Sequence, residues 1–328
     1  MSPKDMLMLI DSYLERNKAQ RVMKSPEECL ELLKDFTGIE EDKYFPGTGR
    51  GVSHLFRGHE DANYALETSL DRKGGRYKRR AENFLIQEFR RRMHLYFSSE
   101  SITNSDLVIL ALMQHYGIPT RLLDVTRSPY VALYFAVRDA LKDADAAVWV
   151  FDIVNIRSRS IRRVFSEDPQ LGKQIGKFIN PFIEFTRQEL FAKWFMSDAS
   201  LSHLGVEESL PQQEIILDFN PFRMNSRLVT QQGLFLASGS PCKTFEETLI
   251  DILQDIESQM GEGSFEPSVF KMIIPKNFRR PLLRYLEKMN ITAASLFEGP
   301  VGFADSLREK LSIMDDHDFR GYMMGLPT

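Results

Sequence analysis

Two short segments carry the side chains best suited to bind an anion. The first is Leu55-Phe56-Arg57-Gly58-His59, where a short run that predicts a strand ends in arginine and glycine. A planar guanidinium can hold a phosphate or carboxylate through two hydrogen bonds at once. The glycine lets the backbone bend or lets a ligand approach closely. Taken alone, a strand-end arginine can equally pair with a structural carboxylate.

The second segment spans residues 110–136 and is the densest in polar groups beside a helix start. Apolar spacing predicts a helix that ends near His115 and Gly117, and Ser128-Pro129 predicts the start of the next helix. Free N–H groups and partial positive charge at such a start favour an anion. The polar candidates between the two helices are Thr120, Arg121, Asp124, Thr126 and Ser128. A structural interpretation has Thr126 or Ser128 capping the helix and Arg121 paired with Asp124.

Three further side chains lie beside predicted strands. Gln231 and Gln232 precede Gly233, which opens the apolar run 233–237. Their amides can donate and accept hydrogen bonds to a sugar, although exposed glutamines in a turn fit the pattern too. Glu214 begins the apolar run 214–219, so a carboxylate stands at the start of another predicted strand.

Basic residues gather between Arg72 and Arg92, ending in three consecutive arginines at 90–92. The spacing predicts a helix over 76–98. Such a basic helix could follow a phosphate backbone, but a solvated helix face is the commoner meaning.

Bulk properties narrow the class of protein. The chain has 328 residues, 43% of them hydrophobic and 27% charged, which is typical of a folded protein. Its net charge of -4 gives no global attraction to nucleic acid or membranes. Two cysteines exclude a disulfide scaffold and a four-thiolate zinc site, and a cytoplasmic location fits best. No signal peptide, membrane span, metal-ligand spacing, nucleophile motif or phosphate-binding Gly-rich loop is found.

The elements that must position these residues are mixed. Helices are predicted at 3–20, 26–36, 76–98, 103–116, 130–142, 187–196, 245–260, 278–289 and 303–312. Strands are predicted at 52–57, 146–154, 214–219, 233–237 and 270–274. Strict strand-helix alternation is absent, so we expect an α+β fold. We expect residues 1–45 to form a helical appendage and 46–328 one domain, with a helical insert at about 155–210.

The chain resembles the FRG-domain family, which is named for the element seen here as Phe56-Arg57-Gly58. The match is strongest from Gln114 to Asp124, continues to Ala136 and resumes at Arg227 with Gln231–Phe235. It covers roughly residues 50–310. The family is poorly characterised, so this resemblance implies no specific activity.

A weaker resemblance is to ADP-ribosyltransferases, which implies split mixed and antiparallel sheets with inserted and flanking helices. It implies NAD as substrate, with Arg57 on its phosphate or ribose, and Thr120, Thr126 and Ser128 ordering the pocket. The glutamate expected on a later strand would be Glu214 by placement. If Gln231 or Gln232 occupies that position instead, either Asp124 supplies the negative charge or the protein is not a transferase of the usual kind. The candidate NAD-binding residues are Arg57, Gly58, His115, Thr120, Arg121, Thr126, Ser128 and Gln231, and the candidate catalytic residues are Arg57, His115, Asp124, Glu214 and Gln232.

The leading hypothesis is therefore an NAD-dependent ADP-ribosyltransferase that modifies nucleic acid or protein in a defence or toxin context. A basic helix at Arg72–Arg92 would contact a nucleic-acid acceptor. One alternative is a non-catalytic module that binds a nucleotide or nucleic acid. Another is a hydrolase of such ligands with His115 and Asp124 as acid and base.

Overall fold

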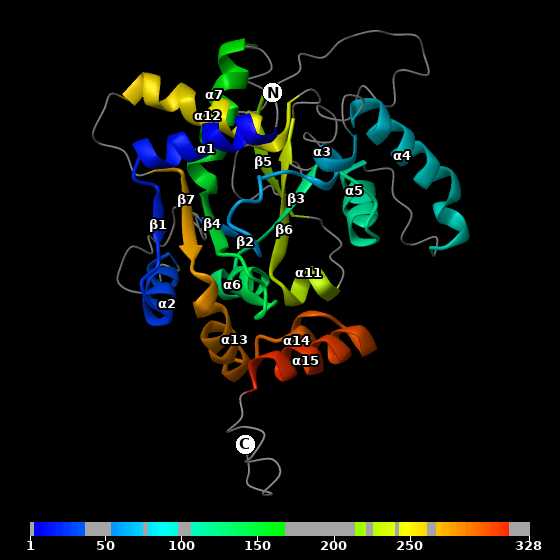
Figure 1. The fold of residues 1–328 in the computed structure, drawn as a ribbon. Coiled ribbons are helices and arrows are strands. Elements are labelled where there is room, and N and C mark those ends of the chain that lie inside the picture. The colour runs from blue at the N-terminus through cyan, green and yellow to red at the C-terminus, as the bar shows by residue number, and fades with distance from the viewer. Residues whose placement is uncertain are drawn as a thin grey trace, which may run out of the picture.

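A computed structural model of the protein describes residues 3–36, 54–74, 78–97, 106–167, 214–220, 226–239, 243–260 and 267–314. Within these ranges seven strands form one mixed sheet in the order β1-β7-β4-β2-β3-β6-β5 (Figure 1). They are β1 (Gln20–Val22), β2 (His54–His59), β3 (Leu122–Thr126), β4 (Ala146–Asp152), β5 (Ile216–Phe219), β6 (Gly233–Ser238) and β7 (Val269–Ile274). β1 and β7 run parallel, and every other neighbouring pair is antiparallel. The α+β class is confirmed.

The centre of the sheet is nearly divided. β2 pairs with β4 along its whole length, and β3 does the same with β6. Between β2 and β3, however, the pairing is confined to Phe56 opposite Thr126. The sheet therefore consists of a mixed half and an antiparallel half joined at one point, where two separate sheets were expected.

Helices cover one face of the sheet continuously. Successive strand residues point to opposite faces, so the core to which each belongs identifies its face. In β4, Trp149 and Phe151 pack in a core with α1 (Pro3–Arg16), α7 (Ile153–Glu167) and α12 (Phe245–Met260). Leu234 and Leu236 of β6 belong to the same core. This face therefore spans both halves of the sheet.

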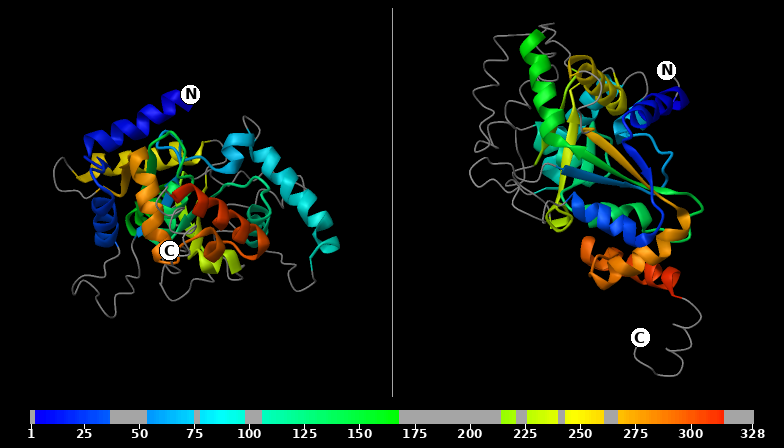
Figure 2. Two further views of the ribbon diagram at one scale, coloured as in Figure 1. Left: turned by 60° about the horizontal axis from the view of Figure 1, so that its bottom comes forward. Right: turned by 90° about the vertical axis from the view of Figure 1, so that its left-hand side faces the viewer.

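The opposite face carries two separate cores. Val148 and Val150 of β4 pack with α2 (Pro26–Asp35), α6 (Pro129–Val137), α13 (Arg279–Lys288), α14 (Ala293–Leu296) and α15 (Gly299–Ile313). Phe235 of β6 packs instead with α4 (Lys78–Arg92) and α5 (Asp106–His115). Figures 1 and 2 show α4 as the outermost helix on its side. The helices on this face therefore form two groups, one over each half of the sheet.

Helix starts follow the expected caps. The side chains of Ser25 and Ser128 accept hydrogen bonds from the third residue after each, at the starts of α2 and α6. Thr244 and Glu247 bond reciprocally at the start of α12, as a capping box does.

Some elements were not expected, and some expectations lie outside the described residues. β1 falls at the end of the predicted first helix, and β3 falls between the two helices of the 110–136 segment. β1 adds an edge to the sheet beside β7. The expected helical insert begins with α7, and its part beyond residue 167, including a predicted helix at 187–196, lies outside the described residues. Among the described helices none is long and apolar enough to cross a membrane.

Candidate functional site

A pocket of about 770 Å³ lies where β2 and β3 diverge. Its floor comes from the two strands and from β6, and its walls come from α5, α6, the segment 60–67 and α11 (Ser226–Thr230). The polar residues that line it are Arg57, His59, Glu60, Asn63, Tyr64, Glu67, Arg72, Gln114, His115, Asp124, Thr126, Arg227 and Gln231. A cavity of this size is typical of small-molecule sites.

Arg57 bridges the gap between the diverging strands. One of its Nη groups donates to the main-chain carbonyl of Asp124 at 2.6 Å, and its Nε donates to His59 at 3.0 Å. Burial lowers the pKa of Arg57, the Asp124 carboxylate opposes that shift, and the nearby Arg72 cation adds to it. Arginine stays protonated despite such a shift. The pocket therefore holds a fixed cation.

The His59 ring holds the Arg57 side chain in place by accepting its Nε hydrogen bond. Its side chain is buried, and burial followed by the charges of Arg57 and Lys271 lowers its pKa well below the ordinary value. The ring is thus neutral at pH 7 and has one acceptor nitrogen. Two donors face it, Arg57 at Nε2 and the Trp149 indole at Nδ1, at 3.0 and 3.3 Å. We assign the acceptor to Nε2, because the shorter contact has the charged donor.

Asp124 is the carboxylate that the fold presents to the pocket. The other four residues of β3 are buried, whereas Asp124 is exposed. Gln114 from α5 holds it, because the Gln114 amide donates to Asp124 Oδ2 at 2.8 Å. The Gln114 carbonyl in turn accepts from the Thr120 hydroxyl at 2.6 Å. The carboxylate is therefore oriented on one side and left open on the other.

Two further arginines and two aromatic rings complete the lining. Arg72 donates to the Glu67 carbonyl at 2.8 Å, and Arg227 lies over the Phe297 ring at 4.9 Å from its centroid. Both cations line the pocket, as do Tyr64 and Phe135. Positive charge beside aromatic faces suits a ligand that carries both phosphates and a flat ring system.

His115 shares this pocket with Asp124 and Arg57. Burial and the nearby Arg227 cation lower its pKa. The imidazole is therefore neutral at pH 7 and could accept a proton. The structure thus brings three of the predicted catalytic residues to one cavity.

Gly58 serves helix packing. A Cβ at this position would lie 2.0 Å from the Ala132 carbonyl oxygen and 2.6 Å from the Ala136 nitrogen of α6. These backbone atoms cannot move independently of the helix. Gly58 also lines the pocket, but the partner whose close approach requires a glycine is α6.

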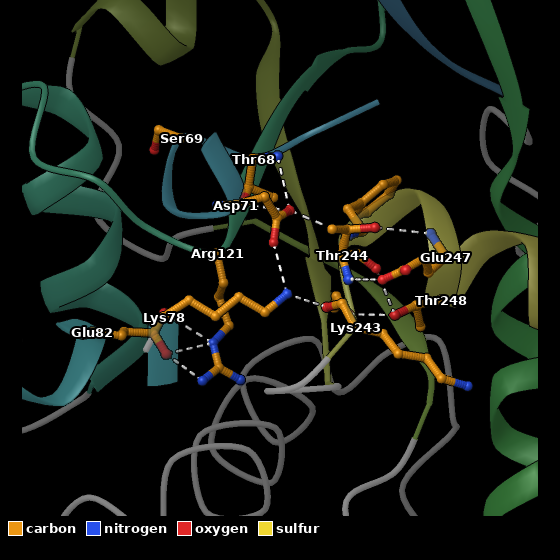
Figure 3. A network of polar contacts seen from close by, with 12 residues as sticks. Thr68, Ser69, Asp71, Lys78, Glu82, Arg121, Lys243, Thr244, Glu247 and Thr248 are labelled. Carbon is orange, nitrogen blue, oxygen red and sulfur yellow. Dashed lines mark hydrogen bonds and ion pairs between the residues drawn. The ribbon is translucent and has the colours of Figure 1, made fainter. Parts of the chain in front are cut away.

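Arg121 does not line the pocket and does not pair with Asp124. It forms an ion pair with Glu82 of α4, and its Nε donates to both Glu82 oxygens at 2.8 and 2.9 Å (Figure 3). Thr120 is fully buried against Gln114, and Ser128 caps α6. These residues position the elements around the pocket and lie behind its wall.

Beside this pair lies a second buried set of contacts, centred on Asp71 of α3 (Ser69–Gly74). Asp71 accepts from the backbone and hydroxyl of Thr68, from Lys78 at 2.9 Å and from the Phe245 amide at 3.2 Å (Figure 3). It joins the starts of α3, α4 and α12. We call the contacts of Asp71, Lys78, Arg121 and Glu82 the structural polar network.

Of Glu214, Gln231 and Gln232, which were expected beside later strands, only Gln231 lines the pocket. Glu214 precedes β5 at the sheet edge, is ion-paired with Arg163 and Lys243, and is absent from the lining. Gln232 is exposed with a φ of 48° and also lies outside the lining. Gln231 lines the pocket, and its amide donates to the Leu296 carbonyl at 3.1 Å. The Thr126 hydroxyl donates to the Gln231 carbonyl at 2.7 Å, which ties β3 to α11.

Sequence reasoning did not select His59, Gln114 or Arg227 as site residues, although His59 and Gln114 each adjoin one that it did select. His59 lies two residues from Arg57 and shares its face of β2, a relation that strand alternation could have suggested. Gln114 directly precedes His115. Arg227 lies where the family resemblance resumes, but its place in the wall depends on how α11 packs against β6.

Comparison with known proteins identifies a protein family. The family model of the FRG domain matches residues 53–145, so the chain carries an FRG domain there. This stretch supplies Arg57, His59, Gln114 and Asp124, whereas the wall formed by α11 and β6 lies beyond it. No curated protein and no solved structure matches the chain. The resemblance to ADP-ribosyltransferases therefore stays a prediction.

Proposed function

We propose that the pocket binds NAD and cleaves its N-glycosidic bond, passing ADP-ribose to an acceptor on a nucleic acid or protein. The observation that carries the proposal is one pocket of about 770 Å³ that holds both the Arg57 cation, bonded to the Asp124 main-chain carbonyl, and the Asp124 carboxylate, oriented by Gln114. An enzyme of this kind needs a cation for the phosphates and an anion for the sugar. Both are present, and they come from adjacent strands.

Each lining group has a part in this chemistry. Arg57 and Arg72 offer guanidinium groups to the two phosphates, and Tyr64 or Phe135 offers a face to a ring. The bond from ribose C1′ to the nicotinamide nitrogen breaks, and its electron pair leaves with nicotinamide. Positive charge then develops on the sugar, where the Asp124 carboxylate stabilises it.

The acceptor completes the reaction. Its nucleophilic oxygen or nitrogen bonds to C1′ and gives up a proton. His115 is neutral at pH 7 and lines the same pocket, so it can take that proton. In this proposal Asp124 takes the role expected of Glu214, whose carboxylate is bound to two cations elsewhere.

The test uses the full chain with NAD. Calorimetry measures binding, and chromatography measures released nicotinamide. Asp124→Asn should bind NAD nearly as well but release nicotinamide at least about 100-fold more slowly, because it removes the charge and keeps the shape. Arg57→Ala should weaken binding itself. Asp143→Asn, an exposed exchange of the same type, should change neither quantity.

The outcomes separate the alternatives. Binding without nicotinamide release, unchanged in Asp124→Asn, would replace the proposal with a non-catalytic nucleotide-binding module. Absence of both binding and release would reject NAD as the ligand.

A second candidate function is hydrolysis of a nucleotide or nucleic acid, and the observation that favours it is the shared pocket of His115 and Asp124. In that case His115→Ala and Asp124→Asn should each abolish phosphate-ester cleavage, with no nicotinamide released from NAD. Retained ester cleavage in either variant would exclude the pair.

A further inference from the structure

We propose that the outer face of α4 and the residues that follow it bind single-stranded nucleic acid. The binding of nucleic acid by this face does not depend on the proposed function. The further statement that the bound nucleic acid is the acceptor of ADP-ribose rests on that function. The face is defined by Arg80, Phe84, Arg91, Arg92, Leu95 and Tyr96, and we call it the α4 surface.

Helical spacing places these residues together. Arg80, Phe84 and Arg91 are four and seven residues apart, so they follow one stripe of the helix. The opposite face carries Ile86, Leu85 and Phe89, which pack in the core with α5. Figures 1 and 2 both show α4 on the outside of the molecule, with no described element covering its outer face.

The α4 surface combines exposed rings with positive charge. Phe84 is 61% exposed and Tyr96 is 78% exposed, a large unfavourable exposure for two aromatic side chains. Arg91 and Arg92 share one carboxylate, Glu88, at 2.9 Å each. The other glutamate of α4, Glu82, is buried against Arg121. The surface therefore keeps an excess of positive charge.

Rings between arginines fit an unpaired strand better than a duplex. The rings can stack on exposed base faces while the guanidinium groups contact phosphates, whereas the bases of a duplex are already stacked on each other. A protein partner would bury the rings equally well, but four exposed arginines at positions 80, 90, 91 and 92 favour a polyanion.

A row of aromatic contacts connects the α4 surface to the pocket residue His115. Phe97 follows Tyr96 and contacts the Tyr116 ring at 5.2 Å between centroids, and Tyr116 contacts the ring of the pocket residue His115 at 4.9 Å. Tyr116 is itself 57% exposed. A strand on α4 would thus have bases within reach of the pocket.

The experiment measures fluorescence anisotropy of labelled oligonucleotides of about 12 nucleotides with the full chain. Single-stranded RNA, single-stranded DNA and a blunt duplex form the three arms, each over a series of salt concentrations. The single strands should bind more tightly than the duplex. The RNA and DNA arms decide which sugar the surface prefers.

Variants then separate stacking from charge. Phe84→Ala with Tyr96→Ala should lower single-strand affinity at least about tenfold. Arg80→Gln with Arg91→Gln should reduce the slope of log K against log salt by roughly 1.4. The matched controls are Phe303→Ala with Leu307→Ala, and Arg308→Gln, all at exposed positions of α15. They should change neither the affinity for single strands nor the salt slope.

Equal or tighter binding to the duplex would overturn the inference, as would equal losses in the α15 controls or no binding at low salt. NAD binding by the same samples keeps the two proposals apart. If NAD binds and the oligonucleotide does not, nucleic-acid binding by the α4 surface is rejected and the proposed function stands. If the oligonucleotide binds and NAD is not cleaved, the reverse holds. Label passing from NAD to a bound oligonucleotide, and lost with Phe84→Ala and Tyr96→Ala, would support the acceptor.

Discussion

The structural polar network and the pocket use the same kinds of side chain to different ends. In the network, Arg121 and Glu82 satisfy each other, and Asp71 accepts four hydrogen bonds. In the pocket, Arg57 and Asp124 are each held by a neighbour but keep part of their bonding capacity toward the cavity. A polar residue whose partners fill its bonding capacity holds the fold, and one anchored on a single side is available to a ligand.

The largest effect expected from this contrast is on stability. Arg121→Ala leaves the fully buried Glu82 carboxylate without its cation, which should cost about 3 to 5 kcal/mol in free energy of unfolding. Urea denaturation at pH 7 measures it. The control is Arg308→Ala, whose exposed pair with Asp305 should contribute no more than about 0.5 kcal/mol. Similar losses in the two variants would mean that burial does not distinguish the network.

A smaller loss is expected at Gly58. In Gly58→Ala the new methyl group meets the backbone of α6, so β2 and α6 must separate at a cost of about 1 to 3 kcal/mol. Gly233→Ala is the comparison, because there the methyl meets the Leu228 Cδ2 atom at 2.9 Å, and a side-chain end can move. Thermal unfolding of both variants checks the order. A harmless Gly58→Ala with weakened NAD binding would instead assign the glycine to the ligand.

How much of this was predictable depends on the distance over which each signal acts. The caps at Ser25, Ser128 and Thr244 are local patterns, and the helices they start were found where expected. β1 has three residues and only one partly buried position, too short for a periodic signal.

Long-range partners were beyond the sequence. Glu82 lies 39 residues from Arg121, and nothing in either motif favours it over the nearby Asp124. For the same reason the sequence could list Glu214 beside Asp124 but could not show which carboxylate shares a pocket with Arg57. That choice is made where β2 and β3 part, a feature of the sheet as a whole.

The smallest effect on stability is expected at Glu246, whose side chain is intermediate between those of the network and those of the pocket. It is buried at the start of α12, and one oxygen accepts from the Leu66 amide at 2.7 Å, beside the pocket residues Ala65 and Glu67. The other oxygen is buried without a hydrogen-bond partner. Burial raises the pKa of Glu246 to about 7, the Leu66 amide opposes the shift, and the nearby carboxylates Asp11 and Glu67 add to it while Lys271 opposes it.

The pH dependence follows from that direction. Between the unfolded pKa near 4.5 and the folded value of about 7, the folded state holds a proton that the unfolded state has lost. Stability should therefore fall as pH rises through this window. Glu246→Gln keeps an acceptor for Leu66 and removes the titration, so relative to the original chain it should gain about 1 kcal/mol between pH 5 and pH 6. Urea denaturation across this range measures the gain, with Glu298→Gln at an exposed site as the control. A difference that stays constant with pH would mean that Glu246 is satisfied like the network, by a partner on its second oxygen.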